Sequence, residues 1–234
     1  AILSGMPAGL AVDESLLARD LARRQHGYGR GRRMQIERDV ATIRGGIRSG
    51  ETLGSPIALW IENLDAPAWQ RAMSPVASEI DPAFAELRRL KSPRPGHADL
   101  AGGEKYLRRD LRDILERASA RETTARVAAG AFAKMLLARL GVEIASGVVA
   151  LGPVGAGRAT PSWEEIRRVD DASPLRAVDA ALEAEMVRAV DEAKEQGDTL
   201  GGAVTIIAHG VPVGLGSHVA WTDKLDGRIA QAMM

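Results

Sequence analysis

The 234-residue sequence has no cysteine, which excludes a disulfide framework, a thiolate metal site and a cysteine nucleophile. Aromatic residues make up only 3% of the chain, and this counts against a module that stacks nucleic-acid bases on aromatic rings. The formal net charge is +0, so no global field attracts nucleic acid or an anionic membrane, and any anion recognition must be local. No apolar run approaches the roughly 18 residues of a membrane span and no signal peptide is visible, which predicts a cytoplasmic protein without membrane contact.

Several common cofactor and catalytic signatures are absent as well. The sequence has no G-x-G-x-x-G before a helix, no G-x-x-x-x-G-K-[ST] phosphate loop and no G-x-S-x-G nucleophile elbow. Only four histidines occur, and none stands at metal-ligand spacing, which predicts no metal site. The composition that remains is ordinary for a globular protein, with 45% hydrophobic and 26% charged residues.

Hydrophobic periodicity and turn residues predict both helices and strands. Asp13 is expected to cap a helix that ends near Gly27, and the alternating residues Ile57, Leu59 and Ile61 predict a strand. The other expected elements are a strand at 34–36, a long connection over 64–93 with a short helix near 84–90, helices at 107–116, 119–140, 178–195 and 225–234, a short helix from residue 163, a strand at 142–150, and a hairpin of 203–208 with 211–215.

The stretch 116–132 has the pattern of a helix start surrounded by cations. Ser119 and Glu122 stand at capping-box spacing, and small apolar residues follow them. Val127, Ala131 and Met135 then recur at a four-residue step, as a buried helix face requires. A helix start presents free N–H groups and the positive end of the helix dipole. Arg117 and Arg121 flank this start, so it is a candidate clamp for a phosphate or carboxylate. The alternative is a capped surface helix with solvated arginines.

Two other segments carry arginines among turn residues. In 23–33, three glycines in five residues permit a close backbone approach, and Arg24, Arg30 and Arg33 could reach one anion from different directions. The alternatives for this segment are an exposed basic loop and a short Arg/Gly contact to RNA. In 92–99, Pro93 and Pro95 stiffen the loop that carries Arg94 and His97. Histidine suits proton transfer near neutral pH, although a histidine beside Pro-Gly can equally be a turn residue.

These motifs, taken together, resemble those of chorismate synthase. The matching segments are RRQHGYGRGRR (23–33), RPGHAD (94–99), ERASARETTARVAAG (116–130), DTLGG (198–202) and GLGS (214–217). The resemblance implies an α+β fold, a β-α-β sandwich of antiparallel sheets and helices, assembled as a homotetramer. It also implies the anti-1,4-elimination of phosphate from 5-enolpyruvylshikimate 3-phosphate, which gives chorismate in the last step of the shikimate pathway.

The family uses reduced FMN as its cofactor, which is thought to lend electron density as phosphate departs and to recover it as the C6 hydrogen leaves. Substrate and FMN together bring two phosphates and two carboxylates, about −6 in charge. A cluster of arginines could neutralise that charge, and their planar forks suit carboxylate and phosphate.

The resemblance also assigns roles by motif position. It places Arg24, Arg30, Arg33, Arg94 and Arg121 at the substrate anions, with Arg24 and Arg30 also as nicotinamide-nucleotide (NADP) contacts. Arg117, Ala118 and Ser119 match the segment that contacts FMN, and His97 matches the histidine thought to protonate the reduced flavin.

Two parts of the family pattern have no counterpart in the sequence. The signature Gly-Glu-Ser-His-Gly would lie just before Ala1, and the C-terminal third of the family would follow Met234. We therefore expect 1–234 to be a single domain that is incomplete at both ends relative to the family, and weakly active or inactive by itself. The competing hypotheses are a non-catalytic fragment of the same fold and an Arg/Gly-loop module that binds nucleic acid.

Overall fold

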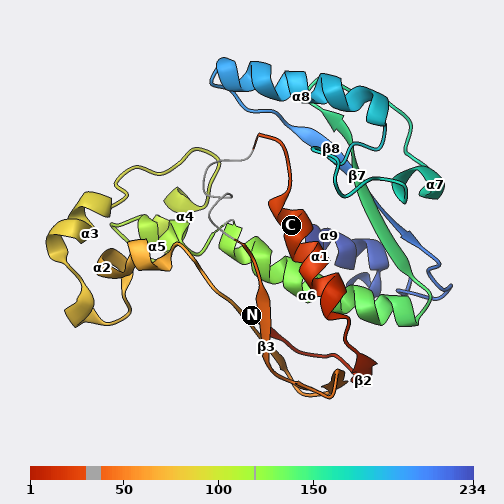
Figure 1. Ribbon diagram of the computed structural model, residues 1–234, viewed down its shortest axis with the longest axis horizontal. Helices are drawn as coiled ribbons and strands as arrows, with labels where there is room; N and C mark the ends of the chain where they lie inside the picture. The colour runs from red at the N-terminus through yellow and green to blue at the C-terminus, as the bar shows by residue number, and fades with distance from the viewer. Residues whose placement is uncertain (30–37, 119) are drawn as a thin grey trace.

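The computed structural model describes residues 1–29, 38–118 and 120–234. The side chains of residues 120 and 121, at the start of a long helix, are not described. The chain is an α+β protein with antiparallel sheets, as predicted (Figure 1). Two helices, α1 (Glu14–Gln25) and α6 (Ala120–Arg139), form its centre. Helix α6 contacts both strand β2 (Ala8–Ala11) and strand β7 (Glu143–Leu151), so it lies between the N-terminal sheets and the C-terminal sheet.

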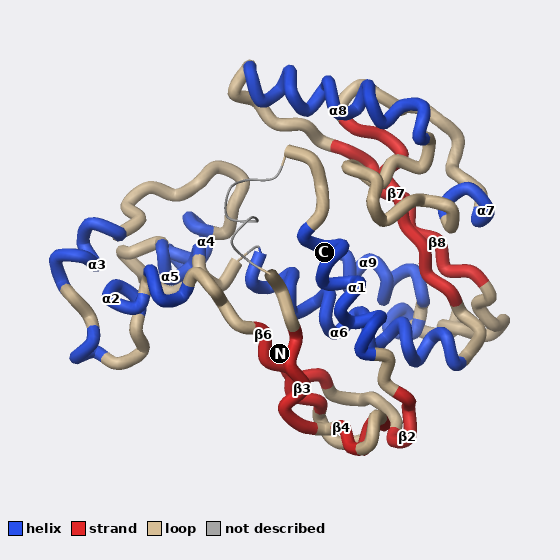
Figure 2. The backbone as a smooth tube through the Cα atoms, viewed as in Figure 1, coloured by secondary structure: helices blue, strands red, loops and turns tan. Residues whose placement is uncertain are grey.

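Strands from the first 61 residues form two small sheets below the helices in Figure 2. One sheet has the order β1-β6-β3 and the other β2-β5-β4. The turn after β3 requires glycine, because Gly46 has a φ of 84° and a Cβ there would stand 2.5 Å from the carbonyl oxygen of Pro56. The predicted strand over Ile57–Ile61 is confirmed as β6. The remaining strands are β1 (Ile2–Leu3), β3 (Ala41–Gly45), β4 (Ile47–Arg48) and β5 (Glu51–Leu53).

The hydrophobic core joins these sheets to the two central helices. Asp13 caps α1 as predicted, since its carboxylate accepts from the backbone N–H groups of Ser15 and Leu16 at 2.9 and 3.1 Å. On α6, the predicted four-residue step is confirmed, because Ala131 and Met135 are buried. The fully buried members of this core are Leu21, Ile57, Ala128, Ala131 and Phe132.

Residues 64–118 fold into a lobe of short helices at one side of α6 (Figure 1). The predicted long connection holds four of these helices, and only the last of them corresponds to the short helix expected near 84–90. The helix expected at 107–116 is shorter than predicted, since only α5 (Arg112–Leu115) lies within this range and the first residue of the range, Leu107, is not helical. The lobe contains the 3₁₀ helices Ala66–Ala68 and Ala77–Glu79 and the α-helices α2 (Gln70–Met73), α3 (Pro82–Arg88), α4 (Asp99–Lys105) and α5 (Arg112–Leu115).

Leu107 marks the break between α4 and α5. Its φ is 54°, in the left-handed region that a branched side chain rarely adopts, and its side chain is 88% exposed. We expect Leu107→Asn to raise the free energy of unfolding by about 0.5 to 1 kcal/mol, because asparagine tolerates this conformation at lower cost. Urea denaturation would measure the change. The matched control is Leu87→Asn at an exposed leucine in α3, where no gain is expected; an equal gain there would contradict the strain argument.

The C-terminal half carries the two-stranded sheet β7-β8, covered on one side by α8 (Ala180–Glu195) (Figure 1). Strand β8 (Gly202–His209) pairs with β7 along its length, from Glu143 opposite His209 to Leu151 opposite Gly202. The predicted hairpin with 211–215 is therefore wrong. Pro212 lacks a backbone N–H for a ladder, and β7 supplies the partner strand instead. The predicted helices near 163 and 225 are confirmed as α7 (Trp163–Ile166) and α9 (Leu225–Met233).

Candidate functional site

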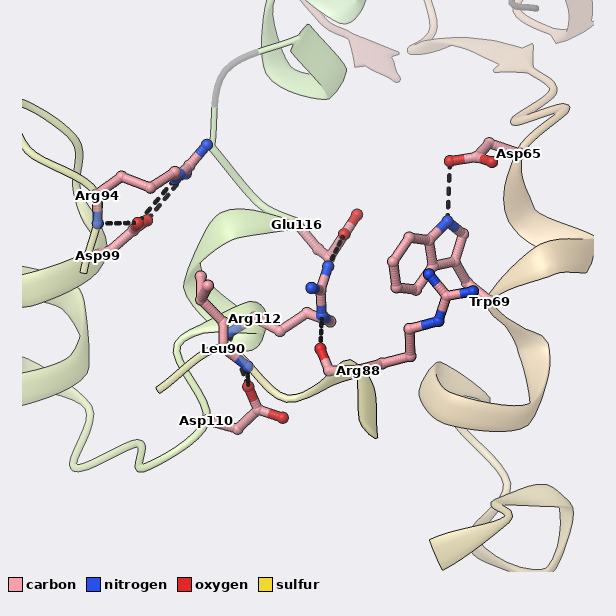
Figure 3. Close-up of polar contacts among 9 residues, drawn as sticks. All are labelled: Asp65, Trp69, Arg88, Leu90, Arg94, Asp99, Asp110, Arg112 and Glu116. Atoms are coloured by element: carbon pink, nitrogen blue, oxygen red, sulfur yellow. Dashed lines mark hydrogen bonds and ion pairs between the residues drawn. The ribbon is translucent and has the colours of Figure 1, made fainter. Parts of the chain in front are cut away.

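In the 64–118 lobe, two guanidinium groups contact the Trp69 indole (Figure 3). The Arg88 and Arg112 guanidinium carbons lie 4.8 and 4.5 Å from the Trp69 ring centroid. The indole N–H donates to Asp65 Oδ2 at 2.9 Å, which fixes the plane of the ring. Each cation–π contact contributes about 0.5 to 1 kcal/mol, so the two contacts together stabilise the packing of Arg88 and Arg112 on Trp69.

Arg112 also connects this stack to the segment before α6. Its Nε donates to the carbonyl oxygen of Arg88 at 2.6 Å, and its Nη1 donates to Glu116 Oε1 at 3.4 Å (Figure 3). Both Arg112 and Glu116 side chains are mostly buried, at 17% and 14% exposed. The position of Glu116, the first residue of the ERASARETTARVAAG motif, is thereby tied to the lobe.

The segment that carries Arg94 and His97 is held at both ends. At its start, the Leu90 N–H donates to Asp110 Oδ1 at 3.0 Å, and the Leu90 carbonyl accepts from the Leu111 N–H at the same distance. At its end, Asp99 enters α4 and binds Arg94 with both carboxylate oxygens. The loop that carries the side chains between is therefore anchored by hydrogen bonds at both ends.

Arg94 makes a forked ion pair with Asp99. Arg94 Nε and Nη2 donate to Asp99 Oδ2 and Oδ1 at 2.8 and 2.9 Å, and the Arg94 backbone N–H donates to Oδ2 at 3.0 Å. The Asp99 carboxylate is fully buried, whereas the Arg94 side chain is 35% exposed. These hydrogen bonds hold the pKa of Asp99 at about 2, below its usual 3.8.

His97 lies in the turn between them. Its backbone N–H donates to the Arg94 carbonyl at 3.4 Å, and Gly96 takes a φ of 71° to close the turn. The imidazole is exposed to solvent, which leaves it accessible to a ligand.

Arg24 brings the end of α1 to the start of α6. Its guanidinium forms an ion pair with the buried carboxylate of Asp39, and its Nη2 donates to Thr123 Oγ1 at 3.3 Å. Residues 24 and 123 are 99 positions apart in the chain, so only the tertiary structure brings them together. The Arg24 side chain is 11% exposed, and part of its function is therefore to hold these two helix ends.

Arg117 and Ala118 line an open pocket between α4 and α5, with a volume of 720 Å³. Arg117 forms an ion pair with Glu122 in the first turn of α6. The pocket wall combines apolar surface from Ala101, Ile114 and Ala118 with the cations Lys105 and Arg117 and with the Arg108–Asp113 ion pair. This volume falls in the range of about 300 to 1,000 Å³ that small-molecule sites have, and the lining suits a planar ring that carries an anionic group.

The start of α6 is joined by a side-chain contact to the 23–33 segment, and the 94–99 loop lies within electrostatic range of Glu116, which precedes it. Arg24 contacts Thr123, Arg117 contacts Glu122, and the charge of Glu116 raises the pKa of Arg94 after the larger effect of its bond to Asp99. Arg30, Arg33 and Ser119 lie outside the described residues, and so does the proposed cap by Ser119. Arg121 belongs to the first turn of α6, but its side chain is likewise not described.

Sequence reasoning assigned no role to Asp99, Arg112 or Lys105. Asp99 closes the RPGHAD motif, and an acidic residue five positions after an arginine was the available signal. Nothing in the local pattern of Arg112 or Lys105 distinguishes them from the other basic residues of the chain.

The Arg94–Asp99 pair predicts a specific acid sensitivity. Because the folded-state pKa of Asp99 is lowered to about 2, its contribution to stability is present above about pH 4 and is lost as the pH falls toward 2. Asp99→Asn removes this titration, so we expect the unsubstituted protein to lose about 2 kcal/mol more stability than the variant between pH 5 and pH 2. Urea denaturation across this range would measure it. Parallel pH profiles of the two proteins would contradict the assignment.

Comparison with known proteins gives the family. A family model described as chorismate synthase matches residues 1–234. The chain belongs to the chorismate synthase family. Chorismate synthases of Exiguobacterium sp. (strain AT1b) and Moorella thermoacetica are 52% and 54% identical to it, over the whole of this chain and 60% and 59% of their own lengths. A solved structure, a crystal structure of chorismate synthase, is 39% identical with a TM-score of 0.75 and covers all of this chain and 61% of its own.

The chain thus spans about three fifths of the length of the chorismate synthases it matches. In the part of the chain that the structure describes, no group of three or more histidines and carboxylates could hold a metal ion. Of the helices in these same ranges, none is both long and apolar enough to cross a bilayer.

Proposed function

We propose that the protein to which these residues belong catalyses the chorismate synthase reaction, the anti-1,4-elimination of phosphate from 5-enolpyruvylshikimate 3-phosphate. The observation that supports the proposal is the contact of Arg24, from the first arginine motif, with Thr123 of the ERASARETTARVAAG motif, where Arg117 pairs with Glu122. Family membership supports the same reaction. We further propose that the protein acts in the cytoplasm as a homotetramer, as the family resemblance implies.

The proposed role of the arginines is to bind and neutralise an anionic substrate. Arg24, Arg30, Arg33, Arg94 and Arg121 would contact its phosphate and carboxylates, with Arg24 and Arg30 also available to a nicotinamide nucleotide. A charge-assisted hydrogen bond contributes about 1.5 to 3 kcal/mol, and several converging on one ligand also exclude water from it. Arg94 has the best-defined geometry of the set, because Asp99 fixes its guanidinium.

Reduced FMN is the proposed cofactor, and the pocket beside α5 fits it in chemistry. Arg117 and Ala118, which the motif assigns to FMN contact, line that pocket, and Ser119 follows them directly in the chain. When bound, the reduced flavin would supply electron density transiently to the substrate and recover it. His97, exposed on its rigid turn, would donate a proton toward the reduced flavin.

A spectroscopic experiment tests this function. Reduced FMN is added to the protein without oxygen, the substrate is then added, and the flavin absorbance and the formation of chorismate are followed. We expect a spectral change that depends on substrate and decays as chorismate forms. If the full-length gene product neither changes the flavin spectrum nor releases phosphate from the substrate, the proposal is refuted.

The arginine roles give a separate prediction. We expect Arg30→Ala and Arg121→Ala each to weaken substrate binding by roughly tenfold to 100-fold, because each removes one charge-assisted contact. Arg139→Ala is the matched control, since it removes an exposed arginine from the opposite end of α6. Calorimetry would give the dissociation constants and thermal denaturation the stability. Unaltered affinity in both variants, or equal weakening in Arg139→Ala, would contradict the assignment.

A further inference from the structure

Asp99 is the most completely enclosed carboxylate in the described part of the chain, with no exposed side-chain surface. Every hydrogen bond found for its side chain comes from one residue, Arg94, through the backbone N–H, Nε and Nη2. A buried carboxylate is costly to desolvate, and here the forked pair offsets that cost. The pair therefore restricts the orientation of the Arg94 guanidinium group as well as the conformation of the loop.

The constraint decides which donors Arg94 can offer to a ligand. A guanidinium has five N–H donors in one plane. Nε–H and one Nη2–H are engaged by Asp99, so the three that remain are both Nη1 hydrogens and the second Nη2 hydrogen. These three point away from the buried carboxylate, and the side chain is 35% exposed. The free edge of Arg94 is thus a fork of its own, suited to two oxygens of a phosphate or carboxylate.

A second carboxylate, Glu116, also acts on Arg94, since its charge raises the Arg94 pKa after the larger effect of the hydrogen bond to Asp99. Glu116 is in turn held by Arg112, which stacks on Trp69 (Figure 3). Asp99 on α4 therefore holds the Arg94 guanidinium in place. The charge of Glu116 adds a weaker electrostatic attraction.

We propose that Asp99 is a positioning residue, whose buried carboxylate fixes Arg94 so that the free Nη1/Nη2 edge faces an anionic group of the substrate. This inference rests on the proposed function and deepens it, since it names the residue that orients one of the substrate arginines. Asp99 itself does not touch the substrate.

Simple electrostatics and positioning predict opposite signs for Asp99→Asn. Removing a negative charge next to Arg94 would strengthen the attraction for an anion if only charge mattered. If orientation matters, a released Arg94 side chain must be immobilised again on binding, and the substrate then binds more weakly. Ordering one long side chain corresponds to roughly a 2- to 13-fold change in affinity.

The experiment measures substrate affinity by calorimetry in the unsubstituted protein, Asp99→Asn and Asp81→Asn. Asp81 is the matched control, because it pairs with Arg71 in the same lobe and caps α3, and asparagine retains the capping oxygen. We expect substrate binding to be roughly 2- to 13-fold weaker in Asp99→Asn and unchanged in Asp81→Asn. Dephosphorylated substrate and inorganic phosphate, tested in parallel, show which anionic group loses affinity.

A second measurement reports on orientation without requiring activity. The Arg94 Nε–H resonance is expected to be ordered and slow to exchange in the unsubstituted protein and mobile in Asp99→Asn. In an Arg94→Ala background, Asp99→Asn should have no further effect on affinity, because the effect acts through Arg94. An equal further loss in that background would show a merely structural role and overturn the proposal.

Equal or tighter substrate binding in folded Asp99→Asn would also overturn it. If Asp99→Asn does not fold, Arg94→Lys provides the test, since lysine keeps the charge but has no fork for both oxygens of Asp99. Affinity of Arg94→Lys within twofold of the unsubstituted protein would refute positioning. Failure of the unsubstituted full-length protein to bind the substrate would instead refute the proposed function, while the Arg94 resonance would still show whether the pair forms.

Discussion

Replacing His97 with alanine is expected to slow turnover by roughly 10²- to 10⁴-fold while changing substrate affinity by less than about twofold. The imidazole is exposed on a turn held by the Arg94–Asp99 pair, so its removal leaves the loop and the substrate arginines in place. General acid–base assistance has this magnitude, and its loss falls on the chemical step. Single-turnover kinetics with reduced FMN would measure the rate, and calorimetry the affinity.

The matched control is His209→Ala. His209 ends strand β8 and stacks on Trp163, with the ring centroids 4.7 Å apart, away from the 64–118 lobe. Its removal should leave turnover within about twofold after correction for stability. Turnover in His97→Ala equal to that of the unsubstituted protein would remove His97 from the mechanism. A fall in both rate and affinity would make it a binding residue instead.

Replacing Phe132 with alanine is expected to lower the free energy of unfolding by about 3 to 5 kcal/mol. Phe132 is among the largest fully buried side chains, and it lies on α6 in the core shared with α1 and the N-terminal sheets. Its removal loses apolar burial and leaves a cavity that neighbours on several different elements cannot easily fill. Such a loss approaches the whole stability of many domains. The variant should therefore unfold at a urea concentration far below the midpoint of the unsubstituted protein.

The control for this prediction is Leu87→Ala, at a leucine of α3 that is 79% exposed. Its effect should stay within about 0.5 kcal/mol, as for other surface substitutions. A loss below about 1 kcal/mol in Phe132→Ala would mean that the core relaxes around the cavity or that α6 is not its centre. Circular dichroism during urea titration would distinguish these results.

Local sequence determined the elements whose signals lie within a few residues. The Asp13 cap, the alternation over 57–61 and the apolar step along α6 each require only near neighbours, and each was predicted with the correct type. Sequence motifs also indicated the family, since they fix residue types at long separations. The α+β class followed from that resemblance and was confirmed.

Pairing between distant segments was decided by the tertiary structure alone. Strand β8 could have formed a hairpin with 211–215 on local pattern, yet it pairs with β7 some sixty positions earlier, because a strand's partner depends on which edge the fold brings to it. The break at Leu107 likewise falls in a stretch with a helical local pattern, yet its φ of 54° places a non-helical residue between α4 and α5.

The candidate site shows the same division. The sequence by itself determined which side chains could bind anions: the arginines of three motifs and the histidine on a proline-stiffened turn. Only the tertiary structure decided that Arg24 meets Thr123 at the start of α6, and that the carboxylate of Asp99 is buried against Arg94. The reason is physical: the charge of a residue is set by its identity, whereas its burial and its partners depend on contacts between residues far apart in the chain.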